Sequence, residues 1–234
     1  MSTSSPNSRV SLVSVPALAA LSAALVGLAI VFAFWVAPED ADQGISQKIF
    51  YFHVPIALTA YACFGFGAWK ALRLLWKGGE RYDLESYVAI HLGVIFGAMT
   101  LLTGSLWAKF RWGHWWLWSE RQLVLFLVLF LFYSAYFMLR YSVEPGPQRA
   151  NLCAVYSLFG VVLNPISFLA IRLANQYIHP VAFNRHGPQM AGSQFFTFCV
   201  CLAAMLALGA ALYQFELAGK RLDARLKELR ELLA

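Results

Sequence analysis

The sequence has few charged residues, and this deficit is the first indication of its class. Only 13% of the 234 residues are charged, whereas 60% are hydrophobic. A soluble domain usually has about a quarter of its residues charged, so the composition argues against an ordinary water-soluble fold. Long apolar runs are present instead, and about 20 apolar residues are enough to span the hydrocarbon core of a bilayer. The composition therefore predicts an integral membrane protein.

The sequence also lacks the cysteine patterns that are associated with redox or metal chemistry. Cys63, Cys153, Cys199 and Cys201 all fall inside apolar runs, and no CxxC pair occurs. A free cysteine in such a setting usually behaves as a small hydrophobic residue. We therefore expect neither disulfides, thiolate metal sites nor thiol–disulfide exchange. No acid–base or nucleophilic constellation is visible either, so we expect a carrier and not an ordinary enzyme.

Six long apolar segments make up most of the chain. Each can cross a bilayer as a helix, which satisfies its own backbone hydrogen bonds where water is absent. The first segment is longer than the apolar core of a cleaved signal peptide, so we interpret it as a membrane helix and not as a removed leader. The predicted fold is all-α, with a single integral membrane domain over residues 1–234. We expect helices at about 16–37, 54–76, 86–108, 121–141, 151–171 and 193–215.

Lysine and arginine are unevenly distributed over the two sides of this predicted bundle. With the N-terminus inside, the inner segments hold twelve of the 18 basic residues and the outer segments hold six. Because cytoplasmic segments of membrane proteins carry the excess of basic residues, we predict that both termini are cytoplasmic. A helical tail at about 216–234 has leucines among alternating charges. We expect it to extend the last helix toward a partner or the membrane surface, or to serve as a basic anchor.

Two histidines and a tryptophan-rich loop fall on one side of the predicted membrane. His53 comes just before the second helix, the loop at 112–118 follows the third, and His179 follows the fifth. Even numbers of crossings separate these positions, so all three lie on the same face. The distribution of basic residues makes this the outer face.

The histidines of the outer face are candidates for binding one metal ion together. A histidine near a membrane boundary is costly to place there and usually has a purpose, although each taken singly also fits an interfacial, hydrogen-bonded histidine. Two imidazoles on one face could bind one metal from opposite sides, and imidazole suits iron, copper or zinc. His114 and His186 share this face but lie in loops away from a helix start, so they are secondary candidates. His91 follows an odd number of crossings and lies on the other side.

Half of the chain's eight tryptophans lie within the seven residues of the loop. An interfacial aromatic belt would spread such residues over many helix ends, whereas this cluster suits a large planar ligand. Lys109, Arg111 and Arg121 flank the loop and could pair with carboxylates on that ligand. A porphyrin with an iron centre and two propionates meets all these demands. A quinone or cation–π site would use the aromatic residues but would leave the paired histidines without a role.

The loop has a counterpart in a known family. The run Trp-Gly-His-Trp-Trp-Leu-Trp at 112–118, followed by Arg121, resembles the tryptophan-rich signature of the heme exporter protein C (CcmC) family of cytochrome c maturation, within the CcmC/CcmF/CcsA superfamily. At one position the chain departs from that signature, because Ser119 stands where the family usually has an acidic residue and Glu120 follows it. Further segments similar to the family are 51–55, 102–107, 164–166 and 175–179.

The resemblance implies a function in heme handling and a role for individual residues. It implies that His53 and His179 ligate the iron of a transiently bound heme b, with Arg111 or Arg121 pairing with the propionates. Gly113 would let the loop backbone approach the ring closely. It further implies that heme is presented on the outer face of a bacterial inner membrane and passed to the chaperone CcmE, beside the ABC transporter subunits CcmA and CcmB and the small protein CcmD, with no nucleic-acid partner. The ring would stack on Trp112, Trp115, Trp116 and Trp118.

Other functions remain open at the level of the sequence. A membrane redox subunit would hold heme b permanently and pass electrons to quinone, but such subunits usually bury their histidines within helices. A structural subunit of an ABC transporter complex would have a purely interfacial aromatic loop. A CcsA-like relative from the other cytochrome c assembly system is a further alternative within the superfamily.

Overall fold

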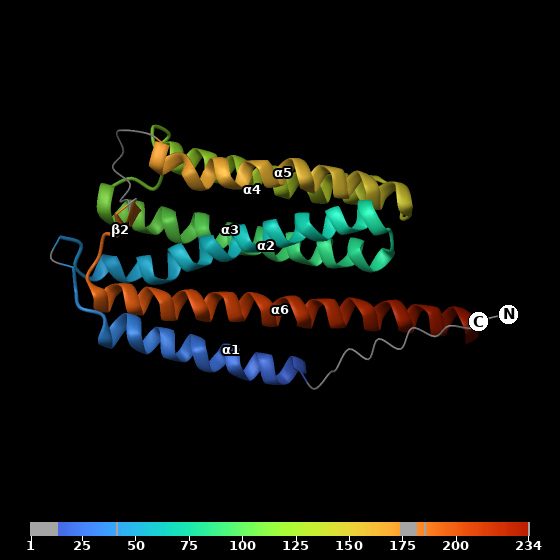
Figure 1. Cartoon of the computed structure of the whole chain (residues 1–234), viewed down its shortest axis with the longest axis horizontal. Helices are drawn as coiled ribbons and strands as arrows, with labels where there is room; N and C mark the ends of the chain where they lie inside the picture. The colour runs from blue at the N-terminus through green and yellow to red at the C-terminus, as the bar shows by residue number, and fades with distance from the viewer. Residues whose placement is uncertain (1–13, 41, 174–181, 185, 234) are drawn as a thin grey trace.

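The computed structural model describes residues 14–40, 42–173, 182–184 and 186–233. In this part of the chain it forms a bundle of long helices (Figure 1). The helices are α1 (Ser14–Val31), α2 (Phe50–Lys77), α3 (Glu80–Trp112), α4 (Arg121–Ser142), α5 (Pro147–Leu173) and α6 (Gly192–Leu233). Six membrane-spanning segments, each long and apolar enough to cross a bilayer, are built on these helices. The predicted all-α fold is therefore confirmed, and the protein is a multi-pass membrane protein.

Short elements frame one end of the bundle. A π-helical turn, η1 (Phe32–Val36), follows α1, and a 3-10 turn, η2 (Ile45–Ile49), leads directly into α2. Strands β1 (Phe183–Asn184) and β2 (Gly187–Pro188) pair antiparallel before α6 and form a small hairpin. The connections from α1 to α2, from α3 to α4 and from α5 to α6 all lie at this end, on the left of Figure 1. We call it the hairpin end.

The helices lie side by side, and consecutive helices run in opposite directions (Figure 1). α2 and α3 form the centre, α4 and α5 cover one side, and α6 followed by α1 covers the other. The rings of Phe64 on α2 and Tyr133 on α4 stack with their centroids 3.9 Å apart. On the other side, the Cys201 thiol of α6 lies 3.8 Å from the Ala29 carbonyl oxygen of α1. α2 is thus packed between the two outer pairs of helices.

The helices are apolar around most of their circumference, because they contact one another on one side and face lipid on the other. Large side chains such as Phe159 and Leu102 point outward and are 69% and 67% exposed. At the helix contacts, small residues such as Ala33 and Ala60 are fully buried. Small residues let membrane helices approach closely, which explains why alanine recurs in this core.

At the hairpin end, α2 and α3 extend further than the sequence predicts. α2 begins at Phe50 and not at residue 54, because η2 continues directly into it. α3 continues to Trp112, past the predicted end at residue 108, and it ends only where Gly113 adopts a positive φ. The hairpin end is therefore more helical than expected. At the opposite end of the bundle, α6 continues without a break to Leu233, over the residues of the expected helical tail.

Buried acidic residues are paired with basic ones at the opposite end of the bundle. Glu85 on α3 is 3% exposed. Its carboxylate lies 2.7 Å from the Lys70 ammonium of α2 and 2.7 Å from the Arg81 guanidinium. Arg221 of α6 approaches the same carboxylate at 3.3 Å. Because a lone buried charge would be strongly destabilising, this cluster ties α2, α3 and α6 together.

Candidate functional site

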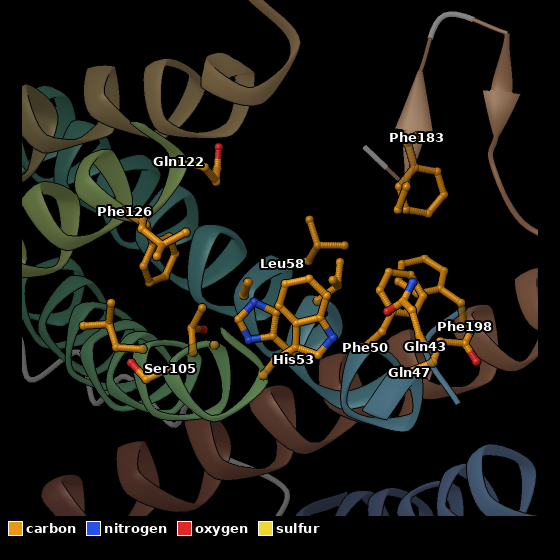
Figure 2. Close-up of a pocket in the computed structure, with 18 of the residues that line it drawn as sticks. Gln43, Gln47, Phe50, His53, Leu58, Ser105, Gln122, Phe126, Phe183 and Phe198 are labelled. Atoms are coloured by element: carbon orange, nitrogen blue, oxygen red, sulfur yellow. The ribbon is translucent and has the colours of Figure 1, made fainter. Parts of the chain in front are cut away.

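A cavity of about 500 Å³ lies at the hairpin end. Residues from α2, α3, α4, α5 and α6 and from the hairpin line it, and most of them are apolar. Its volume is in the range typical of small-molecule and cofactor sites. Figure 2 shows His53 in the middle of the lining, with Gln122 and Phe126 of α4 on one side and Phe183 and Phe198 on the other.

His53 enters the cavity from the first turn of α2. The sequence places this residue just before the helix, whereas in the structure α2 already begins at Phe50. The imidazole is half-buried and lines the cavity. Its Nδ1 lies 2.9 Å from Oγ1 of Thr103 on the neighbouring helix α3. A helical backbone and a hydrogen bond to α3 thus hold the ring in place.

The hydrogen bonds of Thr103 assign the tautomer of His53. The Thr103 hydroxyl donates to the backbone carbonyl of Met99, which can only accept, at 2.8 Å. Since a hydroxyl has a single proton, its oxygen accepts the bond from Nδ1–H of His53. The lone pair of the neutral imidazole is then on Nε2, a nitrogen through which histidine binds metals.

Gly104 lets the imidazole lie close against α3. A Cβ atom built at this position would lie 2.9 Å from Cε1 of His53, which is closer than real side chains approach one another. A larger residue at position 104 would therefore push the imidazole away from Thr103, the residue that precedes Gly104 in α3. Glycine at this position is a condition for the hydrogen bond that orients His53.

Three tryptophans from the end of α3 and the following loop line the cavity. Trp107 and Trp112 pack edge to face with their ring centroids 5.1 Å apart. Trp116 lies further along the loop, and its Nε1 is buried without a hydrogen-bond partner among the described residues. A buried indole N–H normally has an acceptor, so this donor suits a ligand that brings an oxygen atom into the cavity.

The two other tryptophans of the loop lie on the outside. Trp115 and Trp118 are 57% and 73% exposed, and neither belongs to the described cavity lining. The Lys109 ammonium lies 6.0 Å from the centroid of the Trp115 ring, and Trp118 packs edge-on against Trp116 at 5.8 Å. The predicted stacking of a planar ligand on Trp115 and Trp118 therefore stays a prediction.

Gly113 ends α3 and turns the chain into the loop. Its φ of 75° lies in the left-handed region, where L side chains are strained. Its N–H donates to the Lys109 carbonyl at 3.1 Å, as is usual where a glycine ends a helix. The Lys109 ammonium donates in return to the Gly113 carbonyl at 3.0 Å. The close approach of Gly113 to a bound ring stays a prediction, but its role in ending the helix is clear.

The arginines predicted to pair with propionates lie beside the cavity and not in its described lining. Arg111 donates from Nη1 to the backbone carbonyl of Asp42 at 2.8 Å, which fastens the end of α3 to the connection between α1 and α2. Arg121 is the first residue of α4 and is exposed. Their pairing with a ligand stays a prediction.

Glutamine is the most frequent polar residue of the described cavity lining, which also includes Asp40. Oε1 of Gln47 and Oε1 of Gln122 are buried without a hydrogen-bond partner among the described residues. These amide oxygens accept hydrogen bonds, so they suit a ligand group that donates, such as a hydroxyl or a protonated carboxyl group. The glutamines of the lining are Gln43, Gln47, Gln122, Gln189 and Gln194.

Two aromatic residues of the cavity lining also connect neighbouring elements. Tyr61 lies two turns further along α2 than His53, and its hydroxyl is 2.8 Å from Oγ of Ser167 on α5. On the other side, the ring of Phe183 in β1 packs against Phe198 of α6 with the centroids 5.1 Å apart. The hairpin thus covers the cavity from the side of α6.

The remaining histidines differ in their positions. His179 lies outside the described residues, so its role as second iron ligand stays a prediction. His114 and His186 are exposed and are not part of the described cavity lining. His91 lies apart from the cavity, with Nδ1 2.9 Å from a carboxylate oxygen of Glu216 on α6, in agreement with its predicted place outside the site.

Several residues of the site were not predicted from the sequence. Thr100, Gly104 and Trp107 line the cavity at intervals of three or four residues, which places them on one face of α3. Small and polar residues inside a membrane helix, such as Thr103 and Gly104, are the signal that could have indicated this face. Nothing in the local pattern indicates that it meets His53.

The family model described as heme exporter protein C matches residues 2–231 of the chain. The heme exporter protein C of Paracoccus denitrificans is 33% identical over 221 residues, covering 94% of this chain and 90% of the relative. That of Bradyrhizobium diazoefficiens is 30% identical over 194 residues, covering 82% and 73%. A putative cytochrome c biosynthesis ccmC-like mitochondrial protein of Marchantia polymorpha is 25% identical over 192 residues, covering 82% and 81%. The chain therefore belongs to the heme exporter protein C family.

Proposed function

We propose that this protein handles heme for the maturation of c-type cytochromes by holding it in the cavity at the hairpin end. The observation that carries the proposal is that His53 lines a cavity of about 500 Å³ and bonds to Thr103 through Nδ1. We propose that its other ring nitrogen, Nε2, binds the iron. Membership of the heme exporter protein C family supports the same function. Heme b is then a transiently bound cargo, with His53 and His179 as its two axial ligands.

The described lining fits an iron porphyrin. Trp107, Trp112 and Trp116 offer broad apolar surfaces for a planar ring. Imidazole is a common axial ligand of heme iron. The indole N–H of Trp116 is a buried donor without a partner among the described residues, and it suits a propionate oxygen. Arg111 and Arg121, beside the cavity, are proposed to attract the same carboxylates.

The proposal extends to the transfer of heme. We propose that the hairpin end is the outer face of a bacterial inner membrane and that heme passes from there to the chaperone CcmE. Trp115 and Trp118 support a contact with a partner there, because large exposed aromatic side chains are typical of interfaces. The ABC transporter subunits CcmA and CcmB and the small protein CcmD complete the proposed assembly.

The proposal is tested by the absorption spectrum of the protein purified with its native heme. His53→Ala and His179→Ala should each lose the six-coordinate spectrum, because each removes one axial ligand. His91→Ala is the matched control. It also removes an imidazole, but one that is bonded to Glu216 away from the cavity, so it should keep the spectrum.

A six-coordinate spectrum in both single variants at the site would overturn the ligand assignment. If only His179→Ala kept it, Met190 would be the next residue to replace, because its thioether lines the cavity and methionine can ligate heme iron. Variants that lost heme and still supported cytochrome c assembly in cells would favour a permanent redox subunit over a heme carrier.

A further inference from the structure

The last part of α6 carries an apolar stripe that no other described element covers. Residues 222–233, which we call the α6 arm, are all exposed. Its leucines recur at alternating intervals of four and three residues, which is the spacing of the a and d positions of a coiled coil. The stripe consists of Leu222, Leu226, Leu229 and Leu233, which are between 43% and 88% exposed. It has the geometry of a seam between paired helices.

The residues of α6 just before the arm are packed in the bundle. Leu217 is 4% exposed. Glu216 lies 2.9 Å from His91 of α3, and Arg221 lies 3.3 Å from Glu85 of the same helix. An isolated helix as short as the arm would be marginal in water, because its first turn is costly to form. A helix that grows from an existing one avoids this cost, so the arm presents its seam in a set direction.

The length of α6 carries the arm beyond a bilayer. Its 42 residues extend over about 63 Å at 1.5 Å per residue, whereas a bilayer with its headgroups is about 40–45 Å thick. In Figure 1, α6 continues past the ends of α2 and α3 on the right. The arm of a straight membrane helix therefore stands in water, where its leucines have no lipid to cover them. Such a stripe marks a contact with another protein.

The charges beside the seam decide between a second copy and a different partner. In this heptad Arg225 occupies a g position, and Asp223 and Arg230 occupy e positions. Two copies inserted in one membrane have the same orientation, so their arms would pair in parallel. Each Arg225 would then face Arg230 of the other copy, because g and e positions meet across a parallel pair. Like charges oppose this pairing, whereas acidic residues at the facing positions would form ion pairs.

We propose that the α6 arm docks an amphipathic helix of another protein, one with an apolar seam flanked by glutamate or aspartate. The leucines supply the buried area, and Arg225 and Arg230 select the partner by charge. The proposal does not depend on heme binding, because the arm lies at the opposite end of the bundle from the cavity.

The test uses the full-length protein in nanodiscs of uncharged lipid and two fluorescent synthetic peptides of about three heptads. Both peptides have leucine at a and d, but one has glutamate and the other lysine at e and g. Fluorescence anisotropy should show that the glutamate peptide binds about tenfold or more tightly at low salt, a difference of about 1.4 kcal/mol. The preference should shrink as salt screens the charges.

Variants of the arm test the leucines of the seam and the arginines beside it separately. Leu226→Ala combined with Leu229→Ala should abolish binding and keep the helix, because alanine is the best helix former. Ala224→Ser, on the opposite face, should leave binding unchanged. Arg225→Glu combined with Arg230→Glu should reverse the preference in favour of the lysine peptide. Failure of both peptides to bind, equal binding of both, cross-linking of two copies through the arm, or insertion of the arm into peptide-free vesicles would overturn the proposal.

Discussion

At the scale of single residues, the site depends on how one imidazole is held. Histidines that bind metals usually donate their second ring N–H to a neighbouring acceptor, which fixes the ring and raises its basicity. In this protein the acceptor is the Thr103 hydroxyl, 2.9 Å from Nδ1 of His53. A neutral hydroxyl raises the basicity less than a carboxylate would. Under the proposed function, this arrangement orients the iron ligand and suits a heme that has to be released.

We predict that Thr103→Val weakens heme binding about tenfold or more, because loss of a hydrogen bond to a metal-binding histidine usually costs 10- to 100-fold in affinity. Valine has nearly the shape of threonine but offers no acceptor to His53 Nδ1. The dissociation constant is measured by titrating heme into the purified protein, and the absorption spectrum reports the ligation of the iron.

Thr103→Ser is the matched control for this prediction, since it keeps the hydroxyl that bonds both His53 and the Met99 carbonyl. It should bind heme nearly as tightly as the parent protein. Equal weakening by serine and valine would show that the methyl group and its packing matter, and not the hydrogen bond.

At the scale of helices, a buried ion pair joins α3 and α4 at the end opposite the cavity. Arg140 is 7% exposed and donates to both carboxylate oxygens of Asp83, at 2.8 and 2.7 Å. The guanidinium also lies 4.5 Å from the centroid of the Tyr87 ring. A bidentate pair of this kind has a defined geometry. It therefore sets how the two helices meet and, through them, supports the bundle that carries the site.

We predict that Asp83→Ala lowers the stability of the protein by about 3–5 kcal/mol, because removing one partner leaves a buried charge without compensation. Thermal unfolding in detergent should therefore occur at a lower temperature. Replacing both partners, Asp83→Leu with Arg140→Met, should recover most of this loss, since a well-packed apolar pair can substitute for a buried ion pair. A single variant as stable as the parent would contradict the prediction.

At the scale of the whole molecule, every second connection between helices lies at the same end of the bundle. His53 and the loop at 112–118 both lie at the hairpin end, which confirms the crossing parity derived from the sequence for these two. The ion pairs of Glu85 lie at the other end. Which end faces the cytoplasm depends on the positive-inside rule and stays a prediction.

We predict that Ser119→Cys reacts with a membrane-impermeant maleimide in intact right-side-out vesicles, and that Ala224→Cys reacts only after permeabilisation. Both cysteines are introduced into a chain whose four native cysteines are replaced. Ser119 and Ala224 are exposed and lie at opposite ends of the bundle. The reverse pattern of labelling would contradict cytoplasmic termini.

The sequence by itself determined the membrane helices and the side on which their connections lie. The length and hydropathy of each segment decide whether it crosses a bilayer, and the number of crossings decides the side. The loop with Trp112 and Trp116 was also visible, because tryptophans so concentrated are unusual in any sequence. His53 could be assigned to the same end before any fold was known.

Only the tertiary structure decided which side chains face the cavity. Helices that are apolar all round have no strong periodicity to set their rotation. The contact of His53 with Thr103 and Gly104, the glutamine amides of the lining, and the outward position of Trp115 and Trp118 therefore had to come from packing. The physical reason is that lipid and protein interior are equally apolar, so the choice between them is made by shape and hydrogen bonds between helices.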